Sequence, residues 1–192
     1  MVYCQHLVLI LNLYKMRKII FVNLIAVFFI INIADAQINS EVKGVFSMPF
    51  GNNKIVDYGT GLNFNIGYLI KNKLDFSIGA EKIWCASIID GYKISSIQAN
   101  LKYFVFTKDI KPYIGFGIGN FQESFNQPFG NDFKESGIGI IPSIGSLFKS
   151  KIKGLFFDAE LSGYKVYKNH PISIININIG VLYYFRLKVE RK

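Results

Sequence analysis

Asp158 and Glu160 are two carboxylates separated by a single residue, in a segment where apolar and polar side chains alternate. On a β-strand, residues two apart point to the same face, so these two acids would lie side by side. Such a pair can perform acid–base chemistry when a nucleophile and a substrate cleft accompany it. The sequence places no nucleophile beside them, and we therefore predict a structural role for the pair.

Other charged side chains fall on the polar faces of neighbouring predicted strands. The predicted interior polar set comprises Asp75, Glu81, Lys102, Asp158 and Glu160. Lys102 is the cation of this set, and Lys43 is a candidate second cation. Because buried charges need partners or water, we predict a structural network that fills a narrow interior. A narrow polar pore or a gated salt bridge is the alternative interpretation.

Two further features could indicate chemistry but lack the necessary companions. Gly115, Gly117 and Gly119 recur every second residue with no helix after them, unlike a phosphate-binding loop. We interpret them as small residues on the inner face of a narrow barrel. His170 is the only histidine after the N-terminal segment, and the sequence offers it neither catalytic partners nor metal ligands. We predict no catalytic residue, no metal site and no cofactor.

The elements that would position these residues are eight segments of alternating apolar and polar side chains. The predicted strands are residues 38–49, 58–70, 74–85, 94–106, 112–121, 137–147, 154–164 and 172–185. Segments of about ten residues or more can cross a bilayer at a tilt, and lipid requires every backbone group to be paired. We therefore predict an all-β fold, a closed eight-stranded antiparallel transmembrane β-barrel. Pro142 cannot donate to a ladder, so we expect a β-bulge there.

The N-terminus predicts export. Arg17 and Lys18 precede an apolar core at residues 19–31, and Ala34-Asp35-Ala36 has the small-residue pattern of a cleavage site. This core is shorter than the ~20 residues of a membrane-spanning helix. We interpret residues 1–36 as a cleaved signal peptide.

The second apolar stretch before Met16 is unusual for such a peptide, and we expect Met16 to be the true start. Residues 37–192 would then form one barrel domain. Cys85 would be the only cysteine of that domain, so no intrachain disulfide is expected.

The predicted connections alternate between short and long, as periplasmic turns and external loops do in outer-membrane barrels. The short connections concentrate positive charge, with Asp109 as their only acid. Their lysines are Lys71, Lys73, Lys108, Lys111, Lys149, Lys151 and Lys153. One hypothesis is that these lysines reach phospholipid phosphates. The alternative is that they are solvated turn residues.

The longest predicted loop, residues 122–136, contains Phe125, Phe129 and Phe133 at every fourth position. Pro128 and Gly130 disfavour a continuous helix through it. We interpret the loop as a self-packed segment that belongs to an aromatic girdle. The alternative is a contact surface for a partner, a surface glycan or lipopolysaccharide.

The last predicted strand carries a motif of the order polar, any, Gly, any, any, aromatic, any, aromatic. Its defined positions are Asn178, Gly180, Tyr183 and Phe185. With the eight-segment layout and the run at residues 111–119, this motif resembles the small outer-membrane β-barrel proteins of Gram-negative bacteria. That class includes the OmpA transmembrane domain, OmpX and OmpW.

The resemblance implies a location in the cell outer membrane and contacts with its lipids and with lipopolysaccharide. It also implies that the barrel-assembly machinery reads Asn178, Gly180, Tyr183 and Phe185 as an assembly signal. We expect a monomer with no nucleic-acid partner.

We predict a non-enzymatic outer-membrane barrel with a structural or an adhesive, surface-interacting role. One alternative is an accessory factor or enzyme that acts on lipid A or on secretion. Another is a soluble periplasmic barrel that binds a lipid or other apolar ligand. The outward rows of Ile, Leu, Phe and Tyr disfavour this last alternative, because a soluble barrel presents a polar face to water.

Overall fold

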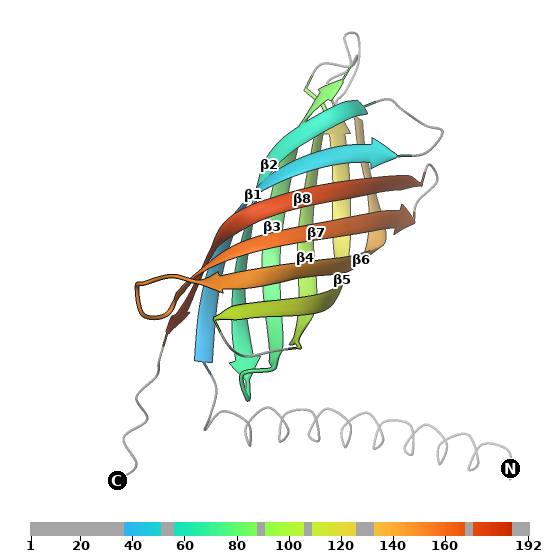
Figure 1. Ribbon diagram of the computed structural model, residues 1–192. Coiled ribbons are helices and arrows are strands. Elements are labelled where there is room, and N and C mark those ends of the chain that lie inside the picture. The colour runs from blue at the N-terminus through green and yellow to red at the C-terminus, as the bar shows by residue number, and fades with distance from the viewer. Residues whose placement is uncertain are drawn as a thin grey trace, which may run out of the picture. The chain divides into compact units, whose positions relative to one another are not determined.

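Eight antiparallel strands form one closed sheet in the computed structural model (Figure 1). The structure describes residues 37–50, 56–87, 91–105, 109–125, 133–167 and 171–185. The strands are β1 (Gln37–Phe50), β2 (Val56–Ile70), β3 (Leu74–Ser87), β4 (Lys93–Phe104), β5 (Ile110–Phe125), β6 (Phe133–Lys149), β7 (Leu155–Tyr167) and β8 (Ile172–Phe185). The predicted all-β class, strand number and closure are confirmed. The segment interpreted as a signal peptide lies outside the described residues.

Each strand pairs with its neighbours in sequence, and β1 pairs with β8 to close the barrel, with Val42 opposite Val181. We call the end with the short connections between β2 and β3, β4 and β5, and β6 and β7 the turn end. The opposite end is the loop end. Among the residues that the structure describes, no helix is long and apolar enough to cross a membrane.

The alternation of side chains separates the two faces of the sheet. Glu41 and Lys43 of β1 are buried in the interior, whereas Val42 between them points outward and is 46% exposed. In β8, Asn178 is buried and Ile179 is 67% exposed. The barrel therefore has an apolar exterior and a largely polar interior, the reverse of a water-soluble domain.

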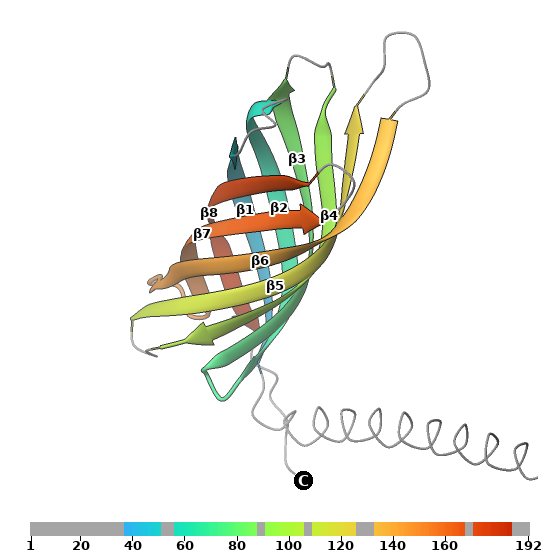
Figure 2. The same ribbon diagram turned by 90° about the vertical axis from the view of Figure 1, so that its right-hand side faces the viewer.

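The hairpin of β5 and β6 is longer than the sequence predicts. The strands extend to Phe125 and from Phe133, and their pairing is continuous, with Gln122 opposite Ser136. The prediction ended both strands early because their outward rows turn polar, as at Gln122, while the backbone ladder continues. As a result the hairpin reaches beyond the ends of β7 and β8 (Figure 2).

The β-bulge expected at Pro142 is wrong. Pro142 pairs with Phe116 on β5 in an unshifted register. On the β7 side, Ile140 opposes Lys165 and Ser143 opposes Ser162, which is the same register before and after the proline. The ladder omits the pairs at positions 141 and 142 without an inserted residue. Proline has no backbone N–H to donate, so the ladder with β7 is interrupted at this point. The register of the strand does not change.

Two apolar clusters lie inside the barrel, one toward each end. The loop-end cluster consists of Val45, Ile83, Tyr92, Ile94, Phe121, Ile141, Tyr164, Val166 and Ile174. The turn-end cluster consists of Leu69, Phe104, Tyr113, Leu147, Phe156, Leu182 and Tyr184. Ile174 and Leu182, which break the polar inner row of β8, belong to these clusters. Glu41, Lys43, Lys102, Asp158 and Glu160 occupy the level between them, whereas the buried Glu123 lies at the loop end beside Tyr92.

Candidate functional site: the barrel interior and its aromatic rim

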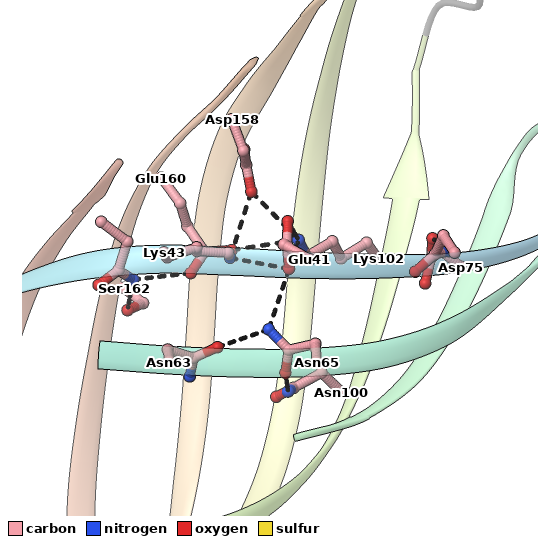
Figure 3. A network of polar contacts seen from close by, with 12 residues as sticks. Glu41, Lys43, Asn63, Asn65, Asp75, Asn100, Lys102, Asp158, Glu160 and Ser162 are labelled. Carbon is pink, nitrogen blue, oxygen red and sulfur yellow. Dashed lines mark hydrogen bonds and ion pairs between the residues drawn. The ribbon is translucent and has the colours of Figure 1, made fainter. Parts of the chain in front are cut away.

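A cluster of two lysines and three carboxylates forms the centre of the interior. Lys43 on β1 places its Nζ atom 2.9 Å from Glu160, 3.2 Å from Asp158 and 3.3 Å from Glu41. Lys102 on β4 places its Nζ atom 2.9 Å from Glu41, 3.3 Å from Asp158 and 3.7 Å from Glu160. Each cation therefore contacts all three acids, and the cluster links β1, β4 and β7 across the barrel (Figure 3).

Neutral donors supply hydrogen bonds to the acids of this cluster. The Tyr113 hydroxyl lies 2.9 Å from Asp158 Oδ1 and 2.8 Å from Glu160 Oε2, so it donates to one of these acids at a time. Asn65 Nδ2 donates to Glu41 at 3.0 Å, and Asn178 Nδ2 donates to Glu160 at 2.8 Å. Buried charges are tolerated only when paired and hydrogen-bonded in this way.

The predicted interior set divides in two. Lys102, Asp158 and Glu160 belong to the central cluster, whereas Asp75 and Glu81 lie apart from it. Asp75 accepts a hydrogen bond from Asn39, and Figure 3 shows it separate from the ion pairs. Glu81 accepts one from Asn63 at 3.0 Å. Within the described residues, neither acid has an ion pair.

Sequence reasoning omitted Glu41 and Tyr113 from the set. Glu41 stands two residues before Lys43, and this spacing already placed both side chains on the inner face of β1. Tyr113 precedes Gly115 on the inner row of β5. Its role depends on contacts with β7, which is not a neighbour of β5 in the sheet, so strand alternation alone cannot reveal it.

The interior leaves little room for a substrate. Beside the cluster lies a cavity of about 20 Å³, with Lys43, Glu81 and Asn178 among its lining residues. That volume is close to the minimum needed for one water molecule. The described residues contain no group of three or more His, Cys, Asp or Glu side chains arranged to hold a metal ion. The arrangement therefore cross-links strands and leaves beside it a space of about the size of one water molecule.

The loop-end rim carries a stack of three aromatic rings. Phe125 lies 4.6 Å from Phe133 and 5.9 Å from Tyr92 between ring centroids, with nearly parallel planes in both pairs. The Tyr92 hydroxyl donates a hydrogen bond to Glu123. Phe125 and Phe133, both half-buried, thus pack together at the end of the β5–β6 hairpin.

Other predicted positions are placed as follows. Phe129 and His170 lie outside the described residues. Gly117 and Gly119 are buried on the inner face of β5. In the C-terminal motif, Asn178 and Gly180 face inward. Tyr183 and Phe185 face outward at the turn end, with their rings in an edge-on contact at 4.8 Å.

Comparison with solved structures identifies barrels of the same architecture. Neisserial surface protein A (NspA) superposes with a TM-score of 0.63 at 18% sequence identity, covering 78% of this chain and 97% of NspA. Ail, the attachment invasion locus protein of Yersinia pestis, gives a TM-score of 0.53 at 17% identity, covering 78% of this chain and 97% of Ail. The N-terminal β-barrel domain of Pseudomonas aeruginosa OprF gives 0.51 at 15% identity, covering 79% of this chain and all of that domain.

No protein-family model and no curated protein matches the sequence. The structural likeness is at low sequence identity, so it concerns the fold. It confirms the resemblance inferred from the strand pattern: the chain has the fold of the small eight-stranded outer-membrane β-barrels.

Proposed function

We propose that this chain is a non-enzymatic protein embedded in an outer membrane, where it has a structural or surface-interacting role. The observation that carries the proposal is the inverted barrel, with apolar side chains such as Ile97 and Ile179 outside and ion pairs inside. A closed sheet satisfies its own backbone, so lipid can surround it. Residues 1–36 would direct its export.

Cell fractionation tests the location. We expect the protein in the outer-membrane fraction, released only by detergent, with a gel mobility that changes on heating because the closed barrel resists the detergent of the gel. Release into the periplasm without detergent would contradict the proposal and favour a soluble barrel with an apolar ligand.

The aromatic rim favours surface interaction over a purely structural role. Phe125, Phe133 and Tyr92 gather at the loop end, where the β5–β6 hairpin extends beyond the ends of β7 and β8 (Figure 2). Aromatic side chains that combine an apolar body with a rigid shape are frequent anchors in protein contacts. Two of the solved neighbours bear names that refer to a surface protein and to attachment, which is consistent with such a role.

Adhesion assays test this second element. The double variant Phe125→Ser/Phe133→Ser should reduce cell attachment or ligand binding while the barrel keeps its heat-dependent mobility. Unchanged attachment would assign these rings to packing within the rim.

If the purified wild-type protein alters lipid A, as judged by mass spectrometry, the non-enzymatic proposal is wrong.

We also propose that Asn178, Gly180, Tyr183 and Phe185 form the signal read by the barrel-assembly machinery. The two outward aromatic rings lie at the turn end of β8, the strand that closes the barrel against β1. Tyr183→Ala/Phe185→Ala should lower the amount of assembled protein in cells more than it lowers refolding of the purified chain into detergent. Equal losses in the two settings would contradict a role in recognition.

A further inference from the structure

The turn end of the barrel exposes a group of five lysines. They are Lys71, Lys73, Lys149, Lys151 and Lys153, here called the turn-end lysines. Among the described residues of the three turns, Asp109 is the only acid, and its carboxylate pairs with Lys149 at 3.0 Å on the surface. One exposed ion pair of this kind neutralises little of the charge. The turn end therefore presents a positive surface.

Apolar side chains lie next to these lysines. Ile152 stands between Lys151 and Lys153 and is 62% exposed, and Ile110 at the start of β5 is 55% exposed. Phe148 points outward beside Lys149. Water alone would solvate the ammonium groups but not these three side chains. An environment that offers anionic oxygen atoms together with hydrocarbon satisfies both kinds of side chain.

The loop end differs in its charge. Among its described residues Lys93, Lys134 and Lys165 point outward, and three carboxylates lie at the same end: Asp57, which is exposed, Glu123, which is buried, and Glu135. Positive charge is thus concentrated at one end of the barrel axis. A general need for solubility would not produce this asymmetry, whereas contact with a negatively charged layer at the turn end would.

We propose that the turn-end lysines bind the phosphate groups of anionic phospholipids in the membrane leaflet at that end, while Ile110, Phe148 and Ile152 lie among the adjoining acyl chains. This inference rests on the proposed membrane location and specifies the lipid class that the barrel selects. Lysine stems are long enough to keep their methylene groups in hydrocarbon and their ammonium groups at the headgroups.

Reconstitution tests the proposal. The purified full-length protein is folded into vesicles of phosphatidylcholine alone and of equal parts phosphatidylcholine and phosphatidylglycerol, and its unfolding equilibrium in urea is measured. We expect the anionic vesicles to shift the equilibrium toward the folded state by roughly tenfold or more at low salt, with a smaller shift at high salt. The variant Lys149→Gln/Lys151→Gln/Lys153→Gln should lose most of this shift.

The matched control is Lys149→Arg/Lys151→Arg/Lys153→Arg, which keeps the charge and should keep the shift. An equal shift in the glutamine variant and the wild type would overturn the proposal. A soluble polyglutamate that reproduces the shift with phosphatidylcholine vesicles would also overturn it and would indicate an acidic protein partner. If the wild type folds in both vesicles without a shift, only this inference fails. If the protein inserts into neither kind of vesicle, the proposed membrane location is wrong as well.

Discussion

Lys43 Nζ lies 2.9 Å from Glu160 Oε2, so an ion pair joins the first strand of the barrel to the seventh. Because these strands are not neighbours in the sheet, the contact passes through the interior and not along the wall. Together with Lys102 and Glu41, it fastens opposite sides of the barrel to each other.

Replacement of Lys102 by methionine should destabilise the barrel by about 3–5 kcal/mol, because it leaves three buried carboxylates with one cation. Lys82→Met is the matched control, since Lys82 points outward on β3 and should tolerate the change within ~0.5 kcal/mol. Urea titration in detergent micelles measures the free energy of unfolding of both variants. Equal losses would show that the interior cluster adds nothing specific to stability.

The acids of the interior should respond unequally to neutralisation. Glu160→Gln removes a carboxylate that contacts both lysines and should cost about 2–4 kcal/mol. Glu81→Gln should change the free energy of unfolding by less than ~1 kcal/mol, because the amide oxygen can still accept the hydrogen bond from Asn63. Measurement of both variants side by side decides the point. A larger loss for Glu81→Gln would contradict the division of the interior described above.

Gly180 has a structural reason to be glycine that is separate from any assembly signal. A Cβ atom there would lie 2.8 Å from Lys43 Cα and closer still to the Val42 carbonyl oxygen. Gly180→Ala should therefore destabilise the purified barrel by about 1–3 kcal/mol, because the backbone of β1 must move. Gly44→Ala lies on the same β1–β8 seam, and its Cβ would be 3.7 Å from the Ile179 oxygen. This control should be nearly neutral in the same refolding assay.

The wild-type barrel should not conduct ions. The loop-end and turn-end clusters fill the interior on either side of the ion pairs, with Phe121 and Tyr164 only 4.6 Å apart between ring centroids. Planar-bilayer recordings should show no steady current after insertion, under conditions in which a large porin conducts. A stable single-channel current would mean that the two clusters open in the membrane.

The alternation of apolar and polar side chains predicts most of the fold. It predicted which face of each strand is polar, because a period of two is preserved wherever one face meets an apolar environment. The alternation fails where the outward-facing side chains become polar. The predicted strand therefore stops before Glu123 and Phe125, although β5 continues through them. The alternation also missed the clusters inside the barrel, because Ile174 and Leu182 look like isolated exceptions along a single strand.

The contacts within the site required information that no single strand contains. Strand alternation placed Lys102 and Asp158 on the inner face, but which acid meets which lysine depends on the strand number and stagger of the closed sheet. Glu41 and Lys102 lie on strands that are not adjacent, and so do Tyr113 and Asp158. The bulge expected at Pro142 was wrong for a related reason: pairing with β5 keeps the register continuous.

The way the central ion pairs are distributed along the chain has a consequence for the order of folding. Lys43 belongs to the first strand, and its partners Asp158 and Glu160 belong to the seventh. A nascent chain that has formed only β1–β4 holds Lys43 and Lys102 with Glu41 as the one acid paired with them, and burying the remaining positive charge is costly. The early hairpins thus gain little by leaving water before the late strands arrive. Insertion into the bilayer should therefore be cooperative. Closure of the barrel and desolvation of the charged side chains should occur in one step.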